Sequence, residues 1–341
     1  MTGQVPLRLA SYNVEWFNAL FDDRAQVLAD DQPSARYQVT RGQQLGALAI
    51  VFTAMNPDGI MIIEAPDTSR SQGRSTVAAL ENFAKQFGLR QRVAVTGFAS
   101  ETEQEIAFLY DPDVLTARHD PKDTRFAPRF DHPYRQDLDG DGLLEQVKFS
   151  KPPLELALTF GRHALRVIGV HTKSKSPRGA FSEAAVRRLA IENRRKQLGE
   201  CQWLRFRAET HLAAGEDVIV MGDFNDGPGL DDYEKLFGRS GVEVVLGPDS
   251  PPQMTLYDPH ADMALSQKLG LQPTTARFWL APQDRFFEAL LDYIMVSHRL
   301  RGGKWRIWHP LNDPVCVQTP ELRDALLQAS DHFPVSLDLI L

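Results

Sequence analysis

The stretch Val218-Ile219-Val220-Met221-Gly222-Asp223-Phe224-Asn225 runs from an apolar segment into a glycine and an Asp-Phe-Asn sequence. The apolar part predicts a buried β-strand that is covered on both faces. Because side chains two residues apart project from one face of a strand, Asp223 and Asn225 can meet the same ligand. A carboxylate beside an amide suits a phosphate transition state, whereas an Asx turn that closes the strand is the structural alternative.

Two segments nearer the C-terminus combine acids with a histidine. Asp292 lies inside the apolar strand predicted for 291–296, where an acid needs a partner, and a histidine would be the natural one. Asp331 and His332 precede the next apolar strand, and they offer a carboxylate for a metal and an imidazole for acid–base chemistry. The structural alternatives are a salt-bridged edge position for Asp292 and a polar turn for Asp331 and His332.

Three further predicted strands end in polar residues. The strand that leads into His171 is followed by Lys173 and Ser174. The histidine can protonate a leaving group, and the lysine and serine can hold phosphate oxygens, although a structural histidine is the alternative. Asn13 and Glu64 stand at the ends of the strands predicted for 7–14 and 59–64, and neither is distinctive alone.

The order of these residues resembles that of the endonuclease/exonuclease/phosphatase superfamily, the deoxyribonuclease-like metal-dependent phosphoesterases. The resemblance runs from Ser-Tyr-Asn-Val-Glu-Trp-Phe at 11–17 through Gly-Asp-Phe-Asn at 222–225 to Ser-Asp-His-Phe-Pro-Val at 330–335. It implies an α/β fold, a four-layer α/β sandwich in which two packed mixed β-sheets are flanked by helices. It also implies a single catalytic domain over residues 1–341.

The resemblance implies a metal-binding set and a catalytic set. Glu64 would be the principal metal ligand, with Asn13 in support and Asp331 as a second carboxylate. The catalytic set would be His171, Asp223, Asn225, Asp292 and His332. Oxygen ligands of this kind favour Mg²⁺, or Mn²⁺, over Zn²⁺.

The resemblance also implies a role for each catalytic residue. Asp223 would position or deprotonate water, and Asn225 would hold a phosphate oxygen. His171 would contact the phosphate and can act as an acid. His332, oriented by Asp292, would be the base or a phosphate-stabilising imidazole.

Two positions leave alternatives open. Either Gln104 or Glu105 could orient His171. Leu290 stands where many relatives carry an arginine, so Arg277 or Arg285 would have to supply that contact.

The leading substrate is a nucleic-acid phosphodiester, which would make the protein a nuclease. The alternatives are a phosphatase or phosphodiesterase for a small phosphorylated metabolite or lipid headgroup, and a catalytically silent binding scaffold. A net charge of -7 argues against a generally basic surface for nucleic acid. Local cations would therefore be needed, and Lys173, Lys175 and Arg178 are the nearest in sequence.

A cytoplasmic protein without membrane insertion is expected, and a monomer is favoured. The chain of 341 residues has only two cysteines, Cys201 and Cys316, so a disulfide framework is not expected. Its N-terminus shows neither a secretory signal nor a run long enough to span a bilayer.

Helical spacing of apolar residues predicts helices at 40–55, 75–87 and 181–212, with a break at Gly199 as an option. The last is rich in arginine, which predicts a solvated face, with a track for phosphates as the alternative. The acidic stretch 137–142 begins like a calcium loop. Its twelfth position is Lys148 instead of glutamate, so an acidic turn is preferred.

Overall fold

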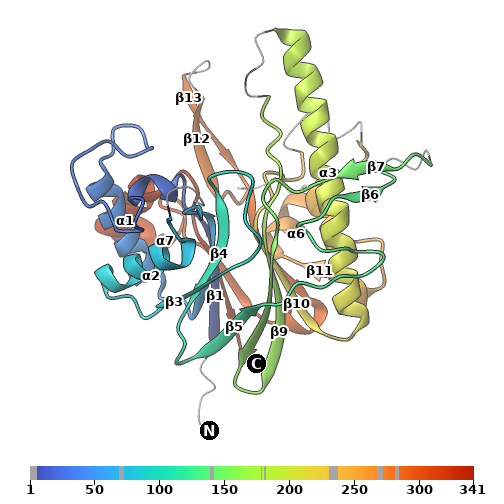
Figure 1. The fold of residues 1–341 in the computed structure, drawn as a ribbon, viewed down its shortest axis with the longest axis horizontal. Coiled ribbons are helices and arrows are strands. Elements are labelled where there is room, and N and C mark those ends of the chain that lie inside the picture. Colours follow the sequence, from blue (N-terminus) through green and yellow to red (C-terminus); the bar gives the residue numbers. More distant parts are fainter. Residues whose placement is uncertain are drawn as a thin grey trace.

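The computed structural model describes residues 6–68, 73–138, 142–177, 179, 182–229, 237–266, 272–280 and 284–341. Two six-stranded mixed sheets pack face to face, and helices cover their outer sides (Figure 1). The predicted four-layer α/β sandwich is confirmed.

The first sheet has the order β15-β16-β1-β2-β4-β3. Its strands are β15 (Lys304–Ile307), β16 (Val335–Leu339), β1 (Leu7–Asn13), β2 (Gly59–Ala65), β4 (Glu105–Tyr110) and β3 (Val93–Thr96). The second sheet has the order β11-β14-β10-β9-β8-β5. Its strands are β11 (Leu256–Tyr257), β14 (Asp292–Ser297), β10 (Asp217–Asp223), β9 (His163–His171), β8 (Leu154–Phe160) and β5 (Leu115–His119).

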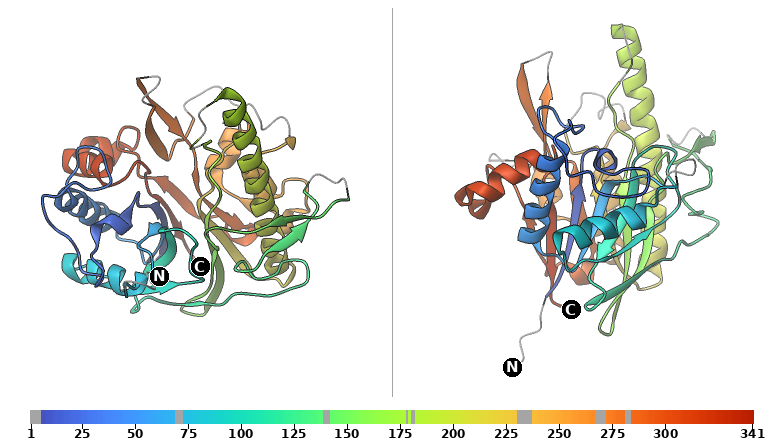
Figure 2. Two further views of the ribbon diagram at one scale, coloured as in Figure 1. Left: turned by 45° about the horizontal axis from the view of Figure 1, so that its top comes forward. Right: turned by 60° about the vertical axis from the view of Figure 1, so that its left-hand side comes forward.

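Three apolar clusters hold the four layers together. The central cluster lies between the sheets, where Leu9 and Met61 of the first sheet join Val167 and Ile219 of the second. A second cluster seals the outer face of the first sheet with side chains of α1 (Arg41–Met55), α2 (Thr76–Phe87), α7 (Pro314–Gln318) and α8 (Pro320–Ala329). The third joins α3 (Glu183–Ala213), α5 (Gly241–Leu246) and α6 (Pro259–Leu265) to the second sheet. Figure 2 shows these helices on opposite outer sides of the sheets.

Short elements complete the chain. The 3-10 helices are η1 (Phe17–Leu20), η2 (Pro252–Met254) and η4 (His298–Leu300). Two hairpins stand apart from the main sheets: β6 (Tyr134–Gln136) with β7 (Glu145–Val147), and β12 (Ala276–Leu280) with β13 (Arg285–Ala289). Figure 1 shows β12 and β13 projecting from the end of the sandwich opposite the C-terminus.

The helix α3 corrects the sequence analysis at Gly199, where it continues without a break. The glycine is needed because hairpin β6–β7 packs directly on the helix. A Cβ at position 199 would lie 2.6 Å from Cγ2 of Val147. The Gly199 carbonyl also accepts a hydrogen bond of 2.6 Å from Nε2 of Gln136.

The arginines of α3 do not form the predicted solvated face throughout. Arg194 is fully buried and donates to Asp226 at 2.7 Å, and Arg207 is fully buried against Glu155. Arg205 is also buried and pairs with Glu209. These guanidinium groups tie the helix to the second sheet and its loops, so neither the solvated face nor the phosphate track describes them.

Two predictions concern residues that the structure does not fully describe: the acidic turn and the cations near the site. Residues 139–141 of the acidic turn, and Arg178 among the expected cations, lie outside the described residues. Among the described residues, no helix is both long and apolar enough to cross a membrane.

Candidate active site

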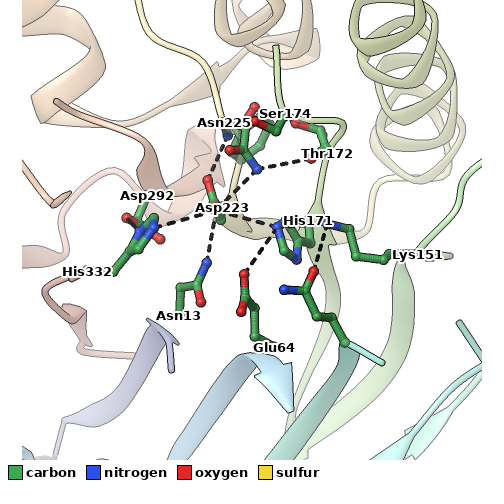
Figure 3. A network of polar contacts seen from close by, with 12 residues as sticks. Asn13, Glu64, Lys151, His171, Thr172, Ser174, Asp223, Asn225, Asp292 and His332 are labelled. Carbon is green, nitrogen blue, oxygen red and sulfur yellow. Dashed lines mark hydrogen bonds and ion pairs between the residues drawn. The ribbon is translucent and has the colours of Figure 1, made fainter. Parts of the chain in front are cut away.

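Strand register gathers the predicted residues at one end of the sandwich. β1 and β2 run parallel in the first sheet, so Asn13 and Glu64 lie at neighbouring strand ends. In the second sheet β9 and β10 run parallel, with His171 opposite Asp223. The antiparallel β14 begins with Asp292 opposite Asp223. The carboxyl ends of four strands thus meet the amino end of β14 (Figure 3).

Asp223 is the centre of the polar network. Its Oδ2 accepts hydrogen bonds from Nδ2 of Asn13 at 3.0 Å and from Nδ2 of Asn225 at 3.3 Å. The same oxygen lies 3.6 Å from Nε2 of His171 and 4.0 Å from Nε2 of His332. One buried carboxylate oxygen therefore faces polar groups from both sheets.

The turn after β10 fixes Asn225 beside Asp223. Oδ1 of Asp223 accepts from the Asn225 amide at 2.7 Å, and the Asn225 side chain also donates to the Thr172 carbonyl at 3.1 Å. Asn225 has a left-handed backbone with φ 46°, which asparagine tolerates better than most residues. The Asx turn and the functional interpretation of this segment are therefore both compatible with its geometry.

His332 and Asp292 form a buried pair. Nδ1 of His332 lies 2.8 Å from Oδ2 of Asp292. The backbone amide of Asp292 donates to Oγ1 of Thr275 at 2.9 Å, which holds the start of β14 in place. Because Nδ1 is engaged, Nε2 of His332 is the ring nitrogen that faces Asp223.

Glu64 occupies a β-bulge at the end of β2. The pairing with β4 shifts between Ile63 and Ala65, and Glu64 adopts a left-handed φ of 62°. Bulges re-aim side chains at sheet edges and beside active sites. Here the carboxylate accepts from the Trp16 amide at 3.2 Å, and its other oxygen lies 4.0 Å from Nε2 of His171.

Lys151 stands between His171 and Gln104. Its ammonium group lies 2.9 Å from Nε2 of His171 and donates to Oε1 of Gln104 at 3.4 Å. Glu105 instead accepts from the Ser100 amide at 3.0 Å. Of the two alternatives for orienting His171, Gln104 is therefore the one linked to the histidine, and the link runs through Lys151.

Asp331 borders the site together with an acid that the sequence analysis missed. Oδ1 of Asp331 lies 4.0 Å from Nε2 of His332. Glu15, two residues after Asn13, forms an ion pair with Arg36, and both line the same groove as Asp331. Burial, followed by the charge of Asp331, raises the pKa of Glu15 to about 7.

Burial shifts the proton affinities of the central groups in opposite directions. It raises the pKa of Glu64 and raises that of Asp223 to about 7. It lowers the pKa of Lys151, and that of His171 falls well below its ordinary value. Burial also opposes the charged form of His332, but Asp292, Asp223 and Asp331 together raise that pKa well above its usual range. Perturbed groups gathered in one groove are typical of a functional site.

The donor set fits a divalent cation. Oδ1 of Asn13 and Oδ1 of Asp292 are buried acceptors that receive no hydrogen bond. Acceptors of this kind are costly unless a ligand satisfies them. Asp223, Asp292 and His332 also place one potential ligand atom each within 4.8 Å of the others, but Nδ1 of His332 is already bonded to Asp292, so this cluster matches the expected catalytic set and not the expected metal ligands. Figure 3 shows Asn13 and Glu64 pointing from their strand ends toward Asp223 and His171.

A groove of about 1440 Å³ opens over these residues. One wall carries Lys151, Lys173, Lys175 and Ser176. Another carries Arg277, Phe278, Trp279 and Phe286 of hairpin β12–β13. Leu290 packs in the apolar cluster under α3, and of the two arginines offered as substitutes, Arg277 lines the groove.

Sequence reasoning missed Lys151, Arg36 and the aromatic hairpin. Lys151 precedes Pro152-Pro153 in a loop with no strand-end signal, and Arg36 lies in a long irregular segment. The run Ala276-Arg277-Phe278-Trp279-Leu280 has strand composition, and that signal could have indicated β12.

Two packed mixed sheets with carboxylates, amides and imidazoles at their joined ends define a phosphoester hydrolase. The model of the Endonuclease/Exonuclease/phosphatase family matches residues 10–332, and the chain belongs to this family. It is therefore a metal-dependent enzyme that hydrolyses phosphate ester bonds. A comparison with curated protein sequences finds no match.

Solved structures share the fold at low identity. A family protein from Leptotrichia buccalis aligns with TM-score 0.51 and 11% identity, covering 98% of this chain and 100% of that one. An AP endonuclease from Archaeoglobus fulgidus aligns with TM-score 0.50 and 13% identity, at the same two coverages. TDP2 from C. elegans aligns with TM-score 0.50 and 15% identity, covering 98% and 75%. Identities this low show similarity of fold alone.

Proposed function

We propose that this protein is a nuclease that uses Mg²⁺, or Mn²⁺, to hydrolyse nucleic-acid phosphodiesters. The observation that carries the proposal is the groove of about 1440 Å³ over the polar network, in which lysines and arginines stand around the acids of the network. Sites for small ligands are usually about 300–1,000 Å³, so the groove has room for a segment of a polymer. Lys151, Lys173 and Arg277 place positive charge along it in a chain whose net charge is -7.

Glu64 and Asn13 would hold the metal, and Asp331 would supply a second carboxylate. Support comes from the bulge that directs Glu64 into the site and from the unsatisfied Oδ1 of Asn13. Oxygen donors are the ligands that Mg²⁺ prefers. Such an ion neutralises the charge that develops on a phosphate during hydrolysis.

Asp223 would position the attacking water and receive its proton, because it is the carboxylate that faces both histidines. Asn225 would donate to a phosphate oxygen from its fixed position beside Asp223. His332 would present Nε2 to the phosphate, with Asp292 fixing the ring through Nδ1. This pairing favours the phosphate-stabilising role of His332, since Nε2 faces the groove.

His171 would contact the phosphate together with Lys151. An ammonium group can only donate, so the 2.9 Å contact makes Nε2 of His171 the acceptor. Lys151 is then the group that brings a proton and a positive charge to this corner of the groove. We therefore propose the phosphate contact for His171 and assign the nearby cation to Lys151.

Three broader predictions stay proposals. We infer one catalytic domain over residues 1–341, because both sheets contribute side chains to the same network. A cytoplasmic location is supported by two buried free cysteines, a usage typical of reducing compartments. A monomer is the simplest assembly, because one chain supplies every residue of the proposed mechanism.

A metal-dependent activity panel tests the substrate. Purified protein would be incubated with Mg²⁺, Mn²⁺ or EDTA and with single-stranded DNA, RNA, plasmid, abasic duplex or phosphorylated metabolites. We expect oligonucleotide cleavage that requires the metal, and loss of cleavage in the Asp223→Asn variant. Turnover of only a small monoester or a lipid headgroup would contradict the nuclease proposal.

A further inference from the structure

The hairpin β12–β13 carries two large aromatic side chains outside the core. Trp279 and Phe286 are cross-strand neighbours whose ring centroids lie 4.9 Å apart at an interplanar angle of 66°. Trp279 is 52% exposed and Phe286 is 51% exposed. Both line the groove over the polar network. Exposed rings that line a groove, unlike single exposed apolar residues, indicate a binding surface.

The base of the hairpin is joined to the catalytic network. The Arg277 amide donates to the Asp331 carbonyl at 2.7 Å, and the Phe333 amide donates to the Thr275 carbonyl at 2.6 Å. Phe278 packs edge-on against His332 with centroids 5.5 Å apart. The base of the hairpin is therefore held against the catalytic network, and its exposed rings line the same groove as the proposed phosphate position.

Positive charge accompanies the aromatic pair. The Arg277 guanidinium lies over the Phe286 ring, 4.1 Å from its centroid. Lys151, Lys173 and Lys175 line the other parts of the groove. A surface with π-faces beside cations matches a ligand that alternates planar rings with phosphates.

We propose that Trp279 and Phe286 form a stacking platform for an unpaired nucleobase next to the scissile phosphate. The inference rests on the proposed nuclease function, and it narrows the substrate to single-stranded segments of nucleic acid. Bases inside a duplex are already stacked on their neighbours, so a protein ring can stack on a base only where the strand is unpaired.

A lipid is the other ligand with an apolar part beside a phosphate. The rings are disfavoured as a lipid surface because Arg277 lies on Phe286 and because lysines share the groove. A planar base can stack on a ring that a cation backs, and the cations of the groove match the phosphates on either side of that base. The observations therefore favour the nucleobase.

The experiment measures coupling between the rings and one base. Oligonucleotides that are identical except for one abasic residue beside the cleaved phosphate would be compared as substrates in Mg²⁺. The wild-type protein should prefer the intact strand over the abasic one by roughly 5- to 150-fold in kcat/KM, the span of one stacked base. In the double variant Trp279→Ala/Phe286→Ala the preference should fall toward 1.

Two further variants make the result specific. Trp279→Phe keeps an aromatic ring at this position and should retain most of the wild-type preference for the intact strand. Phe126→Ala removes an aromatic side chain that is 73% exposed and outside the groove, so it should leave both substrates unaffected. Thermal melting of each variant checks that the fold is intact. We expect it to be intact because all three side chains are exposed.

The outcomes separate this inference from the proposed function. Cleavage of nucleic acid with the same preference in the double variant would overturn the stacking platform and leave the nuclease proposal standing. No cleavage of any nucleic acid, together with turnover of sphingomyelin in phosphatidylcholine vesicles, would overturn both. Equal cleavage of duplex and single strand by the wild-type protein would also contradict the platform.

Discussion

His332 and Asp292 meet through a hydrogen bond of 2.8 Å between Nδ1 and Oδ2, although they lie 40 positions apart in the sequence. Both side chains are buried, and Thr275 fixes the backbone of Asp292. The carboxylate thereby fixes the orientation of the imidazole and leaves Nε2 facing Asp223. This geometry supports the proposal that the two residues act as one unit.

Replacing Asp292 with Asn should keep the fold and lower kcat by orders of magnitude. The neutral amide would no longer favour the charged form of the imidazole or fix its ring as the carboxylate does, and a similar change in serine proteases costs about 10⁴-fold. Because the residues act as a unit, Asp292→Asn and His332→Ala should be strongly non-additive. A double-mutant cycle on turnover of the best substrate measures the coupling.

Asp258 supplies a matched control for this cycle. Like Asp292, it is a buried aspartate. It caps α6 and accepts a hydrogen bond of 2.9 Å from the amide of Ile294, which lies on β14, the strand that begins with Asp292. Asp258→Asn should lower the melting temperature but leave turnover of the folded fraction unchanged. Additive losses from Asp292→Asn and His332→Ala would mean that the two residues act independently.

Replacing Glu64 with Ala should abolish tight Mg²⁺ binding and activity without unfolding the protein. The side chain points out of a bulge into the groove and contributes little packing. Isothermal titration calorimetry with Mg²⁺ checks the affinity directly. The control is Glu105→Gln on the neighbouring strand β4. The Glu105 carboxylate accepts a hydrogen bond from the Ser100 amide and is not a proposed ligand, so this variant should bind Mg²⁺ with unchanged affinity. Unchanged Mg²⁺ affinity in Glu64→Ala would remove Glu64 from the metal site.

The strand-end residues could be predicted because local sequence carries their signal. An apolar run that stops at Asp223, His171 or Glu64 shows both the strand and the point where it leaves the core. Parallel strands bring such ends to one edge, so the apolar runs and the order of motifs were enough for these ends. Asn225, however, reaches Asp223 through the turn after β10 and not along one face of a strand, as the period of two had predicted. The hairpin of β8 and β9 is equally local, because two apolar, β-prone runs flank the short turn at Gly161-Arg162.

The residues that were missed depend on contacts between distant segments. Lys151 reaches His171 only because β9 places that histidine beside the loop before β8. Gly199 looked like a helix break because its packing partner, Val147, lies on a separate hairpin. The arginines of α3 looked solvent-exposed because their buried partners, such as Asp226 and Glu155, are distant in sequence. Burial of a charge cannot be inferred from composition when its partner lies elsewhere.

Nucleic-acid cleavage should weaken steeply as salt is raised. For single strands, log affinity falls with log salt, and each phosphate that a cation contacts adds about 0.7 to the steepness of that fall. Lys173→Gln removes one such cation and should lower the slope by roughly that amount. Lys122→Gln, whose ammonium pairs with Asp120 away from the groove, is the control. The readout is kcat/KM over a salt series, and salt-insensitive cleavage would argue against phosphate contacts by the groove cations.

Gly222→Ala should destabilise the fold by at least about 2 kcal/mol. Gly222 has φ 140°, a conformation that residues with a Cβ rarely adopt, and an added Cβ would collide with the backbone of Val170 on β9. Chemical denaturation measures the loss. Gly161→Ala is the comparison, since that glycine also has positive φ but its Cβ would meet open space. An equal loss in both variants would mean that strain alone, without the collision, decides the effect.

Stability should depend on pH through Glu200, a fully buried carboxyl on α3. Burial raises its pKa from 4.5 to about 7, while Lys196 and the Lys173 amide act in the opposite direction. A carboxyl whose pKa is higher in the folded than in the unfolded protein contributes stability below the unfolded value. That contribution is lost as pH rises through the folded value. For Glu200 it is fully present below pH 4.5 and is lost by about pH 7, on the order of 3 kcal/mol.

Glu200→Gln should therefore flatten the free energy of unfolding between pH 4.5 and 7. Glutamine keeps an oxygen for the Lys173 amide, which donates to Glu200 at 2.7 Å, but it cannot ionise. Urea denaturation in EDTA at several pH values gives the curves without a contribution from metal binding. Other buried acids affect the pH dependence of the wild type and of Glu200→Gln alike. The difference between the two free energies of unfolding therefore reports on Glu200. Glu192→Gln, an exposed position on the same helix, should reproduce the wild-type curve. If Glu200→Gln follows the wild-type slope as well, Glu200 is ionised in the folded protein throughout this range, and its buried charge is balanced by the lysines around it.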